Sequence, residues 1–382
     1  MEPKIRFKGF DSRLDKSLIG DFCHISTGKS NTQDKKDDGI YPFYVRSPHI
    51  ERSNKYLYDE EAVLTVGDGV GTGKVFHYVN GKYDLHQRVY RMFNFKDINA
   101  KYFYYLFSQK FYKRVMSMTA KSSVDSVRLE MISKMEIEYP SINEQETIAN
   151  YFTSLDSQIS ASTSRLASLK QMKAASLQAI FPQEGETVPK IRFKGFEGEW
   201  KKVKLSELYE RSSIKNDLSF GADKIISVAN MYFIKNSRQV DDDYLRSYNI
   251  MRLGDIAFEG NKSKNFAHGR LVENTIGDGI VSHVFIVMKP ISKNYDLNFW
   301  KYYINNENIM GNILVRSTKS STMMTDLVVD DFLKESILVP SYEEQIEIGK
   351  ILTSLDRQIS LQSQRLEKLK QIKSACLDKM FV

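Results

Sequence analysis

The stretch whose composition most suggests chemistry is a glycine-rich run at residues 67–74, GDGVGTGK. A phosphate-binding loop needs Gly, four residues, Gly-Lys and then Ser or Thr, but Val75 follows Lys74 here. The spacing does not give Gly-x-Gly-x-x-Gly either. The run therefore predicts a tight surface turn between strands, from which Lys74 can reach a DNA phosphate, and nucleotide binding is the less favoured alternative.

Motifs for group transfer and hydrolysis are missing. An adenine methyltransferase would carry Pro-Pro and an aromatic residue after Asn or Asp, and the eight prolines of this chain include no adjacent pair. No Pro precedes an Asp, which removes the Pro-Asp…Glu-x-Lys nuclease pattern, and the six histidines form no i, i+4 pair. We expect His86 and His283, in strand-like runs, to pack or hydrogen-bond. The chain is thus expected not to be an enzyme and to hold no metal.

Polar loop residues point to nucleic acid instead. Three regions combine Arg, Asn and Gln, which can read base edges, with small hydroxyls and phosphate-binding lysines. A net charge of +7 and a pI of about 9.0 are consistent with a polyanionic partner. Ordinary polar loops have the same composition, so that alternative stays open for each residue. The candidates are Lys74, His86, Gln87 and Arg88; Asn261, Lys262, Lys264, Asn265 and Arg270; and Lys121, Ser122, Ser123, Arg128, Arg316, Lys319, Ser320 and Ser321.

The elements that must position these loops occur twice. Residues 139–182 recur at 339–382 with a constant offset of 200, and TSLD, QIS and LKQ match letter for letter. A front marker, PKIRFKGF at residues 3–10, returns at residues 189–196. A repeat at such a distance predicts two structural units, each closed by the same element.

The repeated element is predicted to be a long helix. Each copy opens with Pro-Ser-x-x-Glu, a capping box in which Ser accepts from an early N–H group and Glu144 or Glu344 reaches back. Apolar residues then recur in alternating steps of four and three, which is the seam of a coiled coil. The obvious partner of each copy is the other copy, and the alternative is a helical hairpin used only for packing. The predicted seam is Ile148, Phe152, Leu155, Ile159, Leu166 and Leu169, with Ile348, Leu352, Leu355, Ile359, Leu366 and Leu369.

Residues outside the seam are expected on the outer faces of these helices. Asp156 and Asp356 are identical in the two copies, so we expect them on a surface where partner subunits dock. Lys173 and Lys373 are expected on solvated flanks.

Between the repeats lie two variable segments, roughly residues 11–138 and 201–338, with short alternating runs typical of strands and then one helix each. We therefore predict an α+β fold of two globular α/β domains joined by two long helices. The expected boundaries are 1–139, 140–182, 183–339 and 340–382. Two distant cysteines, no signal peptide and no membrane-length apolar run predict a cytoplasmic protein with no membrane partner.

Taken together, these features resemble the DNA-specificity subunit of type I restriction–modification systems. The resemblance rests on Pro-Ser-x-x-Glu-Gln at residues 140–145 and 340–345, the seams behind them, and Lys-Ile-Arg-Phe-x-Gly-Phe in front of each variable segment. The second front marker continues Gly-Glu-Trp to Trp200, which the first lacks. The resemblance covers essentially the whole chain.

The resemblance implies a non-catalytic subunit that binds double-stranded DNA. Each variable segment is then a target recognition domain for one half of a bipartite sequence, and the paired, antiparallel helices form a coiled-coil spacer that fixes the gap. The pseudo-twofold repeat implies two docked DNA adenine methyltransferase subunits, which carry S-adenosylmethionine, so this chain itself binds no cofactor. Motor-nuclease restriction subunits can join them. The alternative is a coiled-coil scaffold without DNA specificity.

Overall fold

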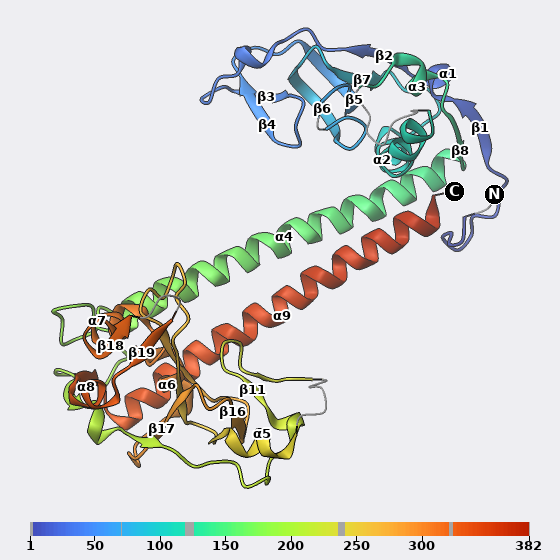
Figure 1. Cartoon of the computed structure of the whole chain (residues 1–382). Coiled ribbons are helices and arrows are strands. Elements are labelled where there is room, and N and C mark those ends of the chain that lie inside the picture. The colour runs from blue at the N-terminus through green and yellow to red at the C-terminus, as the bar shows by residue number, and fades with distance from the viewer. Residues whose placement is uncertain (1–2, 70, 119–125, 236–240, 321–323, 382) are drawn as a thin grey trace. The chain divides into compact units, whose positions relative to one another are not determined.

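A computed structural model describes residues 3–69, 71–118, 126–235, 241–320 and 324–381 (Figure 1). The chain divides into two compact units. Unit 1 runs to Ser164 and also takes in the segment from Ser363 onward, and unit 2 runs from Arg165 to Gln362. Mixed helix and sheet with two long helices confirms the predicted fold class.

The globular part of unit 1 is built on one six-stranded sheet with the strand order β2-β7-β5-β6-β3-β4. Only the β3–β6 pair is parallel among the neighbours in this sheet. Helix α2 (Ala100–Ser117) packs on the sheet, with the rings of Phe76 and Phe107 5.5 Å apart. The strands are β2 (His24–Thr27), β3 (Tyr41–Tyr44), β4 (Ile50–Ser53), β5 (Tyr58–Val66), β6 (Phe76–Leu85) and β7 (Val89–Phe93).

Short elements connect this sheet to the first long helix. Strand β1 (Asp15–Leu18) pairs antiparallel with β8 (Glu136–Tyr139), which leads into helix α4. The remaining elements are α1 (Ile19–Phe22), η1 (Thr32–Asp34) and α3 (Leu129–Ser133).

Unit 2 repeats the frame of unit 1 with a different sheet. Strands β9 (Lys201–Lys204) and β20 (Ser336–Val339) pair as β1 and β8 do, and the main sheet has four strands in the order β10-β17-β14-β15. The sheet strands are β10 (Tyr209–Ser212), β14 (Ile256–Glu259), β15 (Arg270–Glu273) and β17 (Ile286–Pro290). The smaller strands are β11 (Ile226–Ser227), β12 (Tyr232–Phe233), β13 (Asn249–Met251), β16 (Gly279–Val281), β18 (Thr318–Ser320) and β19 (Thr325–Leu327).

The single helix predicted after these strands is interrupted. It forms α6 (Leu297–Tyr303) and α7 (Glu307–Ser317), because the side chain of Asn306 accepts from the backbone N–H of Asn308 at 3.0 Å and caps a new helix. The other short elements of unit 2 are η2 (Leu205–Glu207), η3 (Ala222–Lys224), α5 (Asp242–Ser247) and α8 (Val329–Lys334).

Both predicted long helices are present, as α4 (Ile142–Ile180) and α9 (Tyr342–Met380). In unit 1 the Tyr151 hydroxyl lies 3.4 Å from Cys376 Sγ, and the rings of Phe152 and Phe381 are 5.7 Å apart. In unit 2 Lys173 Nζ lies 2.5 Å from Asp356 Oδ1. Early residues of each helix thus meet late residues of the other within both units, so the helices pair antiparallel.

The predicted seam residues are all removed from solvent to some degree. Ile159, Leu166, Ile359 and Leu369 are half-buried and the other eight are buried. The first turns of each helix also pack on the globular part of their own unit: the Phe152 ring lies 5.0 Å from that of Tyr105 in α2. The seam is therefore more than a helix–helix contact, because its N-terminal positions complete the two domain cores.

Asp156 and Asp356 are partly exposed, with side chains 38% and 36% accessible, and both also make contacts that were not expected. Asp156 accepts a 2.8 Å hydrogen bond from the Tyr105 hydroxyl and pairs with Lys373 of the opposite helix. Asp356 accepts a 2.6 Å bond from Tyr302 and pairs with Lys173. Burial favours the neutral carboxyl of Asp356, but the hydrogen bonds from Lys173 and Tyr302 still lower its pKa. Each aspartate therefore ties a domain helix to both long helices.

The predicted capping box is only partly formed. Ser341 Oγ accepts from the Glu344 N–H at 3.3 Å, as expected. The carboxylates of Glu144 and Glu344, each 1% exposed, instead bind arginines of the front markers. Arg192 Nε and Nη2 both lie 2.8 Å from the Glu344 oxygens, and Arg6 makes the same two-pronged contact with Glu144. A buried carboxylate needs such a charged partner, which a backbone N–H alone would not supply.

The glutamine after each of these glutamates fixes the helix to its domain. Gln145 Nε2 donates to the carbonyl of Pro140 at 2.8 Å, and its Oε1 accepts from the N–H of Asn99 at 2.9 Å, just before α2. Gln345 makes the corresponding contacts, because its Nε2 donates to the carbonyl of Pro340 and its Oε1 accepts from the N–H of Asp296, both at 3.3 Å. Its Oε1 also accepts from Trp300 Nε1 at 3.1 Å. The Pro-Ser-x-x-Glu-Gln motif is therefore a joint between the front marker, the long helix and the domain helix.

A buried carboxyl group lies in the core of unit 2. Glu273, at the end of β15, is 3% exposed, and neither of its carboxyl oxygens has a hydrogen-bond partner in the described part of the chain. Burial raises the pKa of Glu273 to about 9. Glu273 is therefore protonated in the folded protein at neutral pH.

We predict that Glu144→Gln lowers the free energy of unfolding by about 2–4 kcal/mol, because it removes the charged half of the two-pronged contact between the Glu144 carboxylate and Arg6. Urea denaturation measures the change. Glu146→Gln, at an exposed position two residues along α4, is the matched control and should change stability by less than about 0.5 kcal/mol. Equal effects of the two variants would contradict the account of the joint.

We predict that Glu273→Gln stabilises the protein increasingly as pH rises. A carboxyl whose folded pKa is raised to about 9 costs stability once pH exceeds its ordinary value of 4.5. That cost grows by about 1.4 kcal/mol per pH unit until the folded pKa is reached. The variant should therefore melt several degrees higher than the wild type at pH 8 and at nearly the same temperature at pH 5. A melting difference independent of pH would show that Glu273 is ionised in the folded state.

Candidate nucleic-acid interface

Apart from Val70, which lies outside the described residues, the glycine-rich run forms the tight turn predicted between β5 and β6. Gly69 and Gly73 have φ of +82° and +66°, which side chains disfavour. A Cβ on Gly67 would lie 2.8 Å from the carbonyl oxygen of Arg88, so only glycine lets the two backbones approach. Lys74 is exposed, with Nζ 5.0 Å from the ring centre of Tyr112.

Three segments of unit 1 that carry predicted residues lie side by side at this turn. The Gly67 N–H donates to the carbonyl of Arg88 at 2.8 Å, and the Val127 N–H donates to the carbonyl of Gly67 at 2.7 Å. The turn with Lys74, the turn at residues 86–88 and the segment leading to Arg128 thus share one edge. Lys121, Ser122 and Ser123 lie outside the described residues.

His86 supports this edge. It follows β6 and is 4% exposed, and its Nδ1 accepts from the N–H of Arg88 at 3.0 Å. Burial and the nearby Arg46 lower the pKa of His86, which keeps the accepting nitrogen unprotonated. His86 therefore shapes the turn. His283 lies exposed in the turn before β17, so neither histidine is within a strand as expected.

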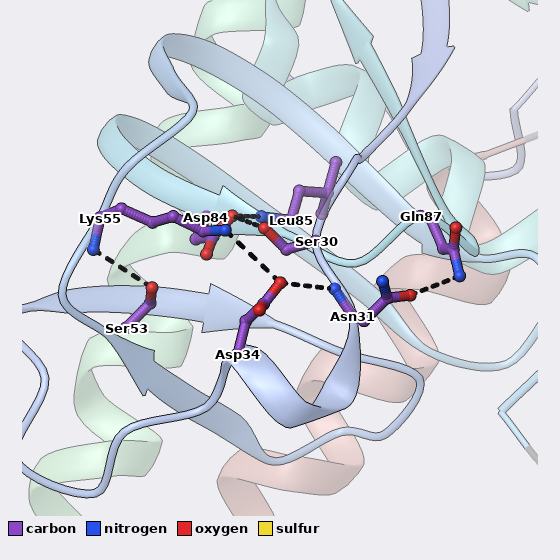
Figure 2. Close-up of polar contacts among 8 residues, drawn as sticks. All are labelled: Ser30, Asn31, Asp34, Ser53, Lys55, Asp84, Leu85 and Gln87. Atoms are coloured by element: carbon purple, nitrogen blue, oxygen red, sulfur yellow. Dashed lines mark hydrogen bonds and ion pairs between the residues drawn. The ribbon is translucent and has the colours of Figure 1, made fainter.

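A polar network fixes the neighbouring loop (Figure 2). Ser30 Oγ donates to Asp84 Oδ1 at 2.6 Å, and both residues are at most 1% exposed. The next residue, Asn31, accepts from Gln87 Nε2 and donates through its N–H to Asp34 Oδ2 at 2.9 Å. Gln87 is exposed but tethered, so it is held in one orientation at this edge.

Two residues of this edge, Arg46 and Asp68, were not among the candidates predicted from the sequence. Arg46, between β3 and β4, donates from Nη1 to Asp68 Oδ1 at 3.4 Å, and Arg88 Nε lies 3.6 Å from Asp68 Oδ2. The arginine side chains are 48% and 63% exposed. An isolated arginine in a loop carries no motif, and only the fold brings Arg46 next to residues 67–88.

Unit 2 places its predicted regions in the same way. The Thr325 N–H donates to the carbonyl of Gly260 at 2.8 Å, and Asn261 forms a β-bridge with Met324. The hairpin of β18 and β19 pairs Lys319 with Asp326. In both units the segment after a central strand, β5 or β14, hydrogen-bonds to the segment that leads into α3 or α8. Ser321 lies outside the described residues.

Two predicted arginines of unit 2 are engaged within the unit. Arg270 donates to Glu259 Oε2 and to the carbonyl of Ala229, both at 2.7 Å. Arg316 binds both carboxyl oxygens of Glu335, at 2.8 and 2.7 Å, and these hydrogen bonds lower the pKa of Glu335. Their contact with DNA stays a prediction, as it does for the exposed candidates. Besides Arg316, the exposed candidates are Lys74, Gln87, Arg88, Arg128, Asn261, Lys262, Lys264, Asn265, Lys319 and Ser320.

Other kinds of site receive no support from the described residues. Among them, no three His, Cys, Asp or Glu side chains are grouped so that they could hold a metal ion. Within the same residues no helix has both the length and the apolar character needed to cross a membrane.

Comparisons with known proteins identify the family that this chain resembles in sequence and fold. The family model of the type I restriction modification DNA specificity domain matches residues 13–171 and 197–371. The chain is 26% identical over 209 residues to the type I restriction enzyme EcoDI specificity subunit of Escherichia coli, which covers 53% of this chain and 46% of that relative, so it spans about half of that relative's length. It is 22% identical to the MjaVIII specificity subunit of Methanocaldococcus jannaschii, over 94% of this chain and 90% of the relative.

A solved structure has the same fold. The crystal structure of the type I restriction–modification S subunit from M. genitalium aligns with a TM-score of 0.64 and 14% identity, covering 100% of this chain and 99% of the other. The two family matches fall on the two repeats inferred from the sequence. The chain therefore belongs to the family of DNA-specificity subunits of type I restriction–modification systems.

Proposed function

We propose that each unit of this chain reads one half of a bipartite target in double-stranded DNA. The supporting observation is that both units place a segment after a central strand beside the segment leading into α3 or α8, and that the exposed residues there differ. The edge of unit 1 presents Gln87 and Arg88, whereas that of unit 2 presents Asn261 and Lys264. Two domains that share a backbone framework but expose different side chains are suited to recognising two different DNA sequences.

The long helices are the proposed spacer and docking element. A 39-residue helix is ~58 Å long at ~1.5 Å per residue. Each helix is anchored to its own domain through Glu144 or Glu344, so helix length translates into separation of the half-sites. The repeat offers two equivalent places for two DNA adenine methyltransferase subunits, to which restriction subunits can add.

The chemistry is assigned to those partners. S-adenosylmethionine and the reacting adenine would be bound by the methyltransferase subunits, and this chain would contribute sequence recognition without catalysis. We place the complex in the cytoplasm, where it would meet DNA. A scaffold without DNA specificity is the weaker reading, because the matched family model describes a DNA specificity domain.

We predict that replacing residues 11–138 with the corresponding segment of another specificity subunit changes one half-site and leaves the other half and the gap unchanged. Selection of bound duplexes from a random library, with methyltransferase subunits present, reads out both halves. The reciprocal replacement of residues 201–338 is the matched control and should change only the other half. If either replacement altered both halves, the units would not be independent readers.

A further inference from the structure

The edge of unit 1 carries an acidic residue where a DNA-binding surface would normally avoid one. Asp68 lies in the glycine-rich turn with its side chain 26% exposed. A carboxylate there repels DNA phosphates, so it weakens sequence-independent binding. The presence of Asp68 is explained if its other interactions improve DNA recognition by more than this repulsion weakens DNA binding.

The two oxygens of Asp68 face two different arginines from two other loops. Oδ1 accepts from Arg46 Nη1 at 3.4 Å, and Oδ2 lies 3.6 Å from Arg88 Nε. Each contact uses one edge of a guanidinium, and the arginines stay about half or more exposed. A guanidinium has five donors in a planar fork, so nitrogens remain for another partner.

The backbone around this trio is fixed independently. Gly67 donates its N–H to the carbonyl of Arg88 at 2.8 Å, and His86 accepts from the Arg88 N–H at 3.0 Å. A Cβ on Gly71 would lie 3.1 Å from the carbonyl oxygen of Arg46, so the same turn also packs closely on the loop of Arg46. The three loops therefore hold Arg46, Asp68 and Arg88 at set positions on one surface.

We infer that Asp68 is a positioning residue that orients Arg46 and Arg88 to read guanine in the half-site of unit 1. Phosphate contacts need charge but little orientation, and lysine serves them well. A bidentate contact with the O6 and N7 atoms of guanine needs the plane and direction of a guanidinium to be set. A single carboxylate that contacts both arginines sets the orientation of their guanidinium groups, but it also lowers the net positive charge of this surface. The inference rests on the proposed function and adds Arg46 to its DNA-contacting residues.

The test uses the full chain co-expressed with its methyltransferase subunits, and compares the methylated motif and DNA binding of variants. Arg46→Ala and Arg88→Ala should each relax a guanine position in one half-site, with a loss of discrimination of about 5–150-fold, and leave the other half unchanged. Arg46→Lys and Arg88→Lys should not restore that discrimination although they keep the charge. Arg13→Ala, an exposed arginine before β1 and outside the six-stranded sheet, is the control and should leave the motif intact.

The Asp68→Asn variant distinguishes two effects of Asp68, its positioning of the two arginines and its negative charge. It keeps both arginines and removes one negative charge, so binding to non-cognate DNA should be equal or tighter while guanine discrimination at the same positions falls. A melting temperature within about 2 °C of the wild type would show that the fold is kept, and Asp68→Glu, which retains the carboxylate, should recover part of the discrimination.

Two results would contradict the inference that Arg46 and Arg88 read guanine. If the lysine variants bind and methylate as the wild type does, and the alanine variants weaken binding to all sequences alike with a shallower salt dependence, then the arginines contact phosphates and the inference is wrong. An unaltered motif in all these variants would also overturn it. Failure of the proposed function is distinguishable, because the wild-type chain itself would then give no bipartite motif.

Discussion

The structure depends on a buried ion pair that occurs twice, Arg6 with Glu144 and Arg192 with Glu344. Each glutamate is 1% exposed at the first turn of a long helix, and each arginine comes from the segment that enters the domain. Removing one partner of such a pair would leave a buried charge uncompensated. The pair therefore fixes the start of the helix to the start of the domain, and Gln145 and Gln345 extend the joint to the domain helices.

This joint lets the rest of each domain vary. Unit 1 has a six-stranded sheet and unit 2 a four-stranded sheet with smaller strand pairs, yet both begin with a strand that pairs with the last strand before the long helix. A second set of contacts connects each domain to the long helices further along them. There Asp156 and Asp356 each bind a tyrosine of their own domain and a lysine of the opposite helix. Between these fixed points the loops can change without changing where the domain sits on its helix.

The sequence predicted the repeated architecture because repetition and heptad spacing are local, countable patterns. All twelve predicted seam positions are buried or half-buried. It did not predict that Glu144 would bind Arg6, because this contact joins residues 138 positions apart and the motif alone favours a capping box. The contacts of Asp156 with Tyr105 and Lys373 were not predicted for the same reason, because these three residues are far apart in the sequence. At the candidate interface, loop composition indicated Arg88 and Gln87, but Arg46 and Asp68 became recognisable only once the turns met.

The most direct test of the account is a genome-wide map of N6-methyladenine in cells with this chain and its methyltransferase subunits, compared with cells lacking only this chain. We expect one asymmetric, bipartite motif to be methylated in the first case and unmethylated in the second. An identical methylation map in both, with the chain and its partners shown to be expressed and assembled, would contradict the assignment of sequence specificity to this protein.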